Sequence, residues 1–84
     1  MEFEQINVND KQTFISFLSL FREDLNNNIA AWENVNLPNF LEALERYTQD
    51  IQGYYDSSDQ SEENANEASW KRFADILKGA RIYE

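Results

Sequence analysis

The stretch LPNFLEALERYTQDIQGY, residues 37–54, carries the clearest helical pattern of the chain. Its apolar residues recur every three or four positions, which places them on one side of an α-helix. They are Leu37, Phe40, Leu41, Leu44, Tyr47, Ile51 and Tyr54. Asn36 is a suitable N-cap, and Pro38 lies in the first turn, where a helix does not need its missing N–H. Gly53 is a natural stop, so these residues predict a helix over 37–54. Tyr54 and Tyr55 could add another turn, because one glycine inside a helix costs only about 1 kcal/mol.

Two more amphipathic helices are predicted on either side of this one, near residues 10–26 and 69–81. One face of the first carries Phe14, Phe17, Leu18, Phe21 and Leu25. One face of the second carries Trp70, Phe73, Ala74, Leu77 and Ala80, and its opposite, solvent face is expected to carry Lys71, Arg72, Asp75 and Lys78. We expect Asn9, answered by Gln12, to cap the first helix, and the asparagines at 26–28 to end it in left-handed backbone. Ser69 is expected to open the last helix.

The connections between these helices differ in character. Residues 56–68, DSSDQSEENANEA, contain no large apolar side chain, so we expect an acidic, solvated loop there. The connection formed by residues 29–35 is short and apolar and is expected to pack against the helices. Only Phe3–Val8 carries a weak strand pattern. The chain is therefore predicted to be all-α, a small three-helix bundle forming a single domain over 1–84.

Aromatic residues make up 14% of the 84 residues, so most of the chain should fold. They are also the largest contributors to a core of this size. We expect the core to contain Phe14, Phe17, Phe21, Phe40 and Phe73.

Several classes of function are disfavoured by composition. The chain has no cysteine and no histidine, so it lacks disulfides, thiolate zinc ligands and the commonest general base. We therefore expect no enzyme and no cofactor. The apolar run Ile29–Ala31, even with Trp32 after it, is far shorter than a membrane span or the core of a signal peptide, and we expect a cytoplasmic protein.

The net charge is −9, from 16 acidic and seven basic residues, but its distribution is uneven. Residues 54–69 carry five acids and no base, whereas residues 70–84 carry four bases and two acids. The simplest explanation is that the basic last helix offsets the acidic segments within the folded protein. A protein with this charge should repel nucleic acid and anionic membranes, and it should attract a basic protein partner.

One metal-binding pattern occurs in the acidic segment. Asp56, Ser58, Gln60, Asn64 and Glu67 fall at positions 1, 3, 5, 9 and 12 of a calcium-loop template. The template needs glycine at its sixth position, where this chain has Ser61, and it normally carries more carboxylates. Calcium binding through 56–67 is thus a weak alternative. The carboxylate pairs Glu42/Glu45 and Glu62/Glu63 are expected on solvated surfaces rather than in a catalytic cleft.

Four aromatic residues lie near the ends of the predicted helices: Trp32, Tyr54, Tyr55 and Trp70. Trp and Tyr are enriched at binding hot spots, which makes these four the candidate partner-binding residues. The alternative for the two tryptophans is that they close the ends of a small bundle. Tyr54 and Tyr55 are neighbours on a helix and cannot both face inward, so one should be exposed.

The last two-thirds of the chain also follow a recognisable pattern. It reads W-x-N-x-x-L-x-x-F-L-E-A from Trp32 to Ala43, then a variable acidic insert, then W-x-x-F-A-x-x-L-x-x-A-x-x-Y-E from Trp70 to Glu84. This pattern resembles a family of small acidic bacterial helical domains of unknown function. The resemblance implies a compact helical domain of bacterial origin, and it implies no activity, cofactor or partner.

The sequence favours a non-enzymatic protein–protein interaction module that binds a basic partner, as small immunity or antitoxin proteins do. The main alternative is a structural or accessory domain that associates with its own copy, forming a homo-oligomer. Ionic strength separates the two, because salt weakens attraction to a basic partner but not hydrophobic self-association. The third possibility is weak calcium binding by the acidic loop.

Overall fold

A computed structural model describes residues 2–84 and confirms the all-α class. Its elements in chain order are the 3-10 turn η1 (Phe3–Gln5), helix α1 (Lys11–Asn27), the 3-10 turn η2 (Ile29–Ala31), helix α2 (Leu37–Ser57) and helix α3 (Trp70–Ala80). No strand is present within the described residues, and η1 occupies the stretch with the weak strand pattern. The three predicted helices are therefore all found, with shifted ends.

The helix starts follow local capping chemistry. Asn36 and Ser69 cap α2 and α3 as predicted, their side chains accepting from the backbone N–H three residues on. The predicted cap of α1 is wrong by one residue, because Asp10 is the cap. Asp10 accepts from the Thr13 N–H at 2.8 Å, and the Thr13 hydroxyl accepts from the Asp10 N–H at 3.1 Å. Gln12 cannot complete this reciprocal pair, since it lies only two residues after Asp10.

Two predicted helix ends are also wrong. Asn28 ends α1 with a φ of −143° and a ψ of 40°, which lies outside the left-handed region, and the chain then enters η2. Helix α2 passes Gly53 and ends at Ser57, which shortens the predicted loop. The extra turn carries Tyr55 into the core, where its side chain is only 1% exposed. Burial of this ring outweighs the cost of about 1 kcal/mol for glycine inside a helix.

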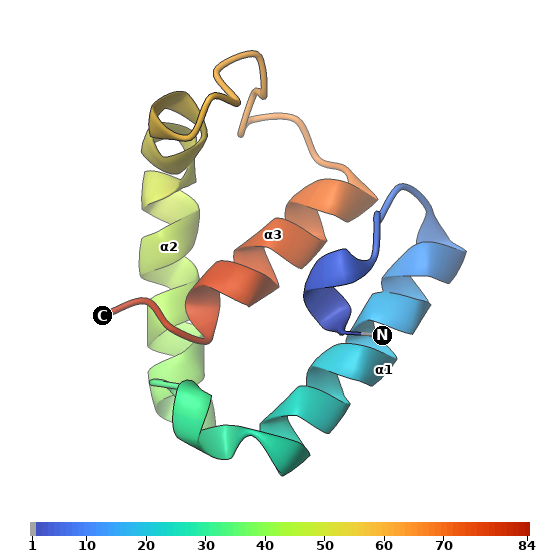
Figure 1. Ribbon diagram of the computed structural model, residues 1–84. Helices are drawn as coiled ribbons and strands as arrows, with labels where there is room; N and C mark the ends of the chain where they lie inside the picture. The colour runs from blue at the N-terminus through green and yellow to red at the C-terminus, as the bar shows by residue number, and fades with distance from the viewer. Residues whose placement is uncertain (1) are drawn as a thin grey trace.

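Helix α3 lies between the other two helices and packs against both (Figure 1). One group of buried residues joins the N-terminal segment, α1 and α3; it contains Phe3, Val8, Phe17, Phe21, Trp32 and Ala74. A second group joins α2 to α3 and contains Tyr47, Ile51 and Tyr55. The buried residues at the end of α3 are Gly79 and Ala80, whose small size lets the helices approach closely.

The five expected core phenylalanines divide into three groups. Phe17 and Phe21 are buried, while Phe14 and Phe40 are half-buried and pack against the core. The prediction for Phe73 is wrong, because its side chain is 43% exposed. Its ring lies at the edge of the α1–α3 contact, 6.5 Å from that of Phe14. A helix wedged between two neighbours buries its small residues most deeply, and the large ring stays at the rim.

The acidic segment between α2 and α3 is held by Arg72, which the sequence placed on the solvent face of α3. That placement is wrong, since Arg72 is buried. Its guanidinium donates to the Glu67 and Asn64 carbonyls at 3.1 and 2.9 Å and to the Glu63 carboxylate at 3.1 Å. Gln52 adds an anchor from α2, accepting from the Ala65 N–H at 2.7 Å. The segment is thus fastened to both flanking helices.

Candidate functional site

The structure does not bring the four predicted partner-binding residues together. Trp32 and Tyr55 are core residues, 8% and 1% exposed, whereas Tyr54 and Trp70 are 52% and 38% exposed. The expectation that one of the adjacent tyrosines is exposed is confirmed. Trp32 borders an apolar groove, Tyr54 and Tyr55 line a second cleft, and Trp70 lines a third depression beside Val8. Whether any of the four binds a partner stays a prediction.

The apolar groove is a depression of about 500 Å³ between α1, the start of α2 and the end of α3. Its apolar lining consists of Leu18, Phe21, Leu25, Trp32, Val35, Leu37, Phe40 and Leu77. Most of these residues belong to the apolar helix faces recognised in the sequence, and the others belong to the connection at residues 32–36. The groove forms where the apolar faces of α1 and of the start of α2 are turned towards each other, with the end of α3 between them.

The floor of the groove is a stack of aromatic rings. The Trp32 ring lies 4.7 Å from that of Phe21 and 6.3 Å from that of Phe40, measured between centroids. The Trp32 indole N–H donates to the Asp24 carboxylate at 2.8 Å, which fixes the orientation of the ring. Above this floor the rim is exposed, and Leu37 is 68% exposed. The groove therefore offers a rigid apolar surface to solvent.

Asn34 fixes the rim in place, a role that could not be predicted from the helical patterns. Its side-chain amide donates to the Ala80 and Tyr83 carbonyls at 2.9 and 2.8 Å, at the end of α3. The backbone N–H groups of Glu33 and Asn34 both donate to the Arg81 carbonyl, at 3.0 and 3.1 Å. In the sequence, the single feature that singled out Asn34 was its place as the N of the W-x-N pattern. These four bonds hold the 33–34 connection against the C-terminal end of the chain.

Most basic side chains of α3 form ion pairs with acidic residues of the same chain, as the charge distribution predicted. Arg72 and Lys71 pair with Glu63 of the acidic segment at 3.1 and 3.5 Å, and Lys71 also pairs with Asp75 at 2.9 Å. Lys78 lies 4.0 Å from Asp75. The remaining ion pair among residues 2–84 is the exposed Arg46–Glu42 contact. The acidic excess is therefore carried by other surfaces.

The calcium-loop positions have other side-chain partners. The Asp56 carboxylate accepts from the Gln52 amide at 3.1 Å, and the Asn64 amide donates to Glu67 at 3.4 Å. Across residues 2–84 there is no group of three or more Asp and Glu side chains that could hold a metal ion. Calcium binding stays a prediction. In the same residues, no helix combines the length and apolar character needed to span a bilayer.

The comparison with protein families yields a match over most of the chain. The model of a group described as "Family of unknown function (DUF7660)" matches residues 10–84, which include all three helices and every residue lining the apolar groove. No curated protein matches the chain, and no solved structure does.

Proposed function

The chain belongs to this family of unknown function, and on that premise we propose that it is a non-enzymatic protein-binding module. The apolar groove receives apolar side chains of a partner whose surrounding surface is basic. The observation that carries this proposal is the exposed leucine rim, with Leu18 and Leu37, above the buried aromatic floor at Trp32. Contiguous exposed apolar surface of this kind is characteristic of interaction sites.

The rigidity of the groove supports binding rather than core packing alone. Asn34 and the Trp32–Asp24 hydrogen bond hold its wall and floor in place without a partner. A preformed surface loses little conformational entropy when a partner docks, so more of the burial energy becomes affinity. Each apolar side chain that enters the groove contributes about 25 cal/mol per Å² removed from water.

The charge supports a basic partner. The net charge is −9, and three of the four bases in 70–84 are paired with acids of the same chain. Exposed acids adjoin groove residues in the sequence, with Glu33 after Trp32 and Glu23 after Arg22. This field accelerates association with a cationic surface and weakens with salt. Arg22 is the single charged residue in the groove lining, so we expect a carbonyl or carboxylate of the partner opposite it.

The absence of histidine and cysteine from the sequence favours the non-enzymatic form of the proposal. An immunity or antitoxin role, bacterial origin and a cytoplasmic location stay predictions. Association with a second copy through the same leucines is the competing assignment, and the experiment below separates it from a basic partner.

The test uses a designed probe rather than an unidentified ligand. The probe is a fluorescein-labelled amphipathic helical peptide with leucines on one face and lysines elsewhere, and a second peptide replaces the lysines with glutamates. The double variant Leu18→Ser/Leu37→Ser removes two exposed residues of the groove. Ile15→Ser/Ile29→Ser is the matched control, because both isoleucines are exposed and neither lines the groove. Fluorescence anisotropy measures binding at low salt and at high salt.

We expect the lysine peptide to bind at low salt, to bind more weakly at high salt, and to lose at least about tenfold in affinity with the groove variant but not with the control. Equal binding of the glutamate peptide, or equal loss in both variants, would contradict the proposal. Sedimentation velocity on the protein alone provides the second readout. A dimer that the groove variant dissociates would assign the groove to a second copy instead.

A further inference from the structure

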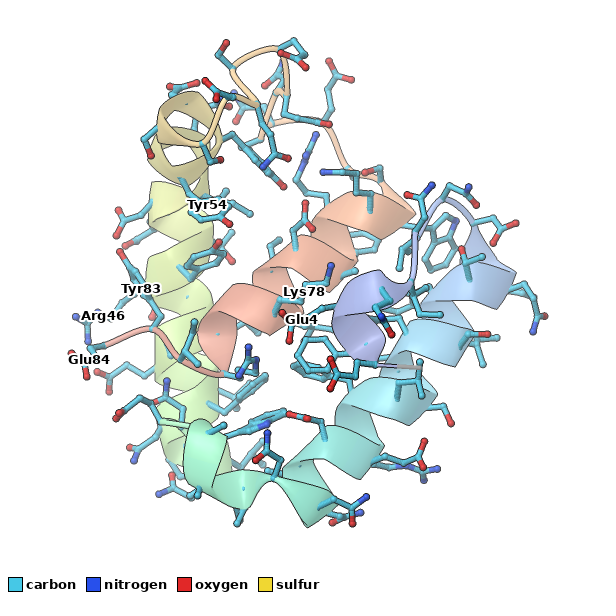
Figure 2. All side chains as sticks on the ribbon, in the orientation of Figure 1. Glu4, Arg46, Tyr54, Lys78, Tyr83 and Glu84 are labelled. Carbon is cyan, nitrogen blue, oxygen red and sulfur yellow. The ribbon has the colours of Figure 1, made fainter. Side chains whose placement is uncertain are left out.

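A second depression lies on the face formed by α2 and α3, with η1 across from them, and we call it the tyrosine cleft. It has a volume of about 670 Å³ and is lined by Tyr47, Tyr54 and Tyr83 and by Lys71, Lys78 and Arg81, among others. Figure 2 shows Tyr54 and Tyr83 towards α2, with Lys78 and Glu4 on the other side. Its size is within the range of small-molecule sites. It shares no lining residue with the apolar groove.

Two cations in the tyrosine cleft have unused hydrogen-bonding capacity. Arg81 forms no ion pair within residues 2–84, and its Nε is buried without a hydrogen-bond partner. Its guanidinium lies over the Phe3 ring, 5.0 Å from the centroid. Lys78 is one turn before Arg81, and its nearest carboxylate oxygen, on Asp75, is 4.0 Å away. A buried donor without a partner is costly and calls for a physical explanation.

Three other polar side chains of the cleft are already engaged within the protein. Lys71 contacts Asp75 at 2.9 Å, and the Tyr55 hydroxyl donates to the same carboxylate at 2.7 Å. The Tyr83 hydroxyl donates to Asp50. Lys78 and Arg81 are therefore the cations of the cleft that are available to a ligand, and they lie one helical turn apart at the end of α3.

The charge of the lining limits the charge of the ligand. Lys71, Lys78 and Arg81 are opposed by Glu4 and Asp75, which leaves a surplus of one positive charge. The whole chain carries −9, so the surroundings disfavour a multiply charged anion. A monoanion such as a carboxylate matches this surplus better than a phosphate dianion does.

The opposite wall of the cleft is aromatic. The Tyr54 ring is half exposed, and its centroid lies 6.1 Å from that of Tyr47, which in turn lies 5.1 Å from that of Tyr83. Burial raises the pKa of Tyr47 to about 12, so its phenol is neutral at physiological pH. Neutral rings at this spacing present apolar faces on which a planar ligand can stack.

We propose that the tyrosine cleft binds a small aromatic monocarboxylate, with its carboxylate between Lys78 and Arg81 and its ring against Tyr54. The Arg81 guanidinium then gains an anionic partner, and the exposed face of Tyr54 is covered. This assignment does not depend on the apolar groove binding a partner.

Phenylacetate is the test ligand, and 2-phenylacetamide, acetate and phenyl phosphate are its matched controls. Each compound is titrated into ¹⁵N-labelled protein while amide chemical shifts are recorded. We expect phenylacetate to shift amides around residues 54, 78 and 81 with saturation. Arg81→Gln and Lys78→Gln should each weaken its affinity about tenfold or more, because each removes a charge-assisted hydrogen bond. Lys11→Gln should leave the affinity unchanged, because Lys11 does not line the cleft and lies far along the chain from residues 54, 78 and 81.

Four results would overturn the proposal. These are equal affinity for 2-phenylacetamide, equal affinity for acetate, tighter binding of phenyl phosphate, and no saturating shift with phenylacetate. If Arg81→Gln does not fold, Lys78→Gln and Tyr54→Ala test the same contacts, because both side chains are partly exposed. Leu18→Ser/Leu37→Ser should bind phenylacetate like the wild type, so failure of the groove and failure of the cleft are distinguishable.

Discussion

The Tyr47 ring of α2 lies directly against the backbone of Gly79 in α3. A Cβ placed on Gly79 would lie 2.1 Å from Cε2 of this ring and 2.2 Å from Cζ, closer than any real contact. Tyr83 and Tyr54 flank the same ring and limit its movement. Glycine at this position thus sets the closest approach of the two helices, and it places Tyr47 and Tyr83 in the wall of the tyrosine cleft.

Gly79→Ala should destabilise the protein by about 1–3 kcal/mol, because the new methyl group forces the Tyr47 ring out of a packed position. Gly53→Ala is the control within the neighbouring helix. A Cβ at Gly53 meets nothing within 4 Å, so alanine should stabilise the protein by roughly 0.5–1 kcal/mol through its better helix propensity. Urea unfolding measures both, and a Gly79→Ala protein as stable as the wild type would contradict the close contact.

Arg72→Lys should destabilise the protein by about 3 kcal/mol, because one ammonium group cannot reach the two carbonyls and the carboxylate that the guanidinium binds. Backbone amides of residues 63–67 should exchange hydrogen faster in this variant. Arg46→Lys is the comparison, since its ion pair with Glu42 is exposed and is expected to contribute less than about 1 kcal/mol. Similar losses in the two variants would refute the anchoring role of Arg72.

Trp32→Ala should cost about 3–5 kcal/mol, because it empties the aromatic floor of the groove and leaves the Asp24 carboxylate without its indole donor. Tyr54→Ala should cost about 1 kcal/mol or less, since half of its ring is already in water. Thermal and urea unfolding measure the difference. Loss of partner binding in a Trp32→Ala protein therefore reports on folding, and only exposed residues such as Leu37 test the groove. Equal stability of the two variants would show that Trp32 is not part of the core.

Stability should fall as the pH rises from 10 to 12. The pKa of Tyr47 is raised by burial from its ordinary value of 10 to about 12. In this interval the unfolded chain has lost the phenol proton while the folded protein still holds it, so ionisation favours unfolding. The pKa of Tyr55 is raised as well, first by burial and then by its hydrogen bond to Asp75. Absorbance at 295 nm follows the ionisation, and urea unfolding follows the stability.

Tyr47→Phe should retain more of its stability than the wild type across this alkaline interval, because it removes one of the groups with a raised pKa. The hydroxyl of Tyr47 makes no hydrogen bond that the substitution would break among residues 2–84, so the two proteins should have similar stability at pH 7. An unchanged alkaline decline in Tyr47→Phe would show that Tyr47 titrates normally in the folded protein.

Local chemistry determined the parts of the fold that were predicted correctly. Helix α2 begins where Asn36 can cap it and Pro38 can enter its first turn, and α3 begins at the Ser69 cap. These signals depend on contacts within three or four residues, so the sequence contains all the information they need. The internal pairing of the basic last helix with acidic segments was likewise visible in the charge distribution alone.

Other features depend on which elements meet in space. Gly53 does not end α2, because Tyr55 gains more from burial against α3 than the helix loses at the glycine. The capping residues could not reveal this, since the partner of Tyr55 is Asp75, twenty residues away. The division of Trp32, Tyr54, Tyr55 and Trp70 among three depressions was equally hidden, because sequence position near a helix end does not specify which neighbour that end faces.

By itself, the sequence determined that this is an all-α chain of three amphipathic helices with an acidic segment between the last two. Only the tertiary structure decided that Arg72 is buried, that Phe73 stays exposed and that Asn34 ties the groove to the end of α3. Periodicity fixes which residues share a helix face, but α3 lies between two helices and therefore buries more than one face. Where these helices come closest, small side chains are enclosed between them, and the long side chain of Arg72 holds the acidic segment. Both outcomes depend on the distances between the helices, which the order of residues along the chain does not reveal.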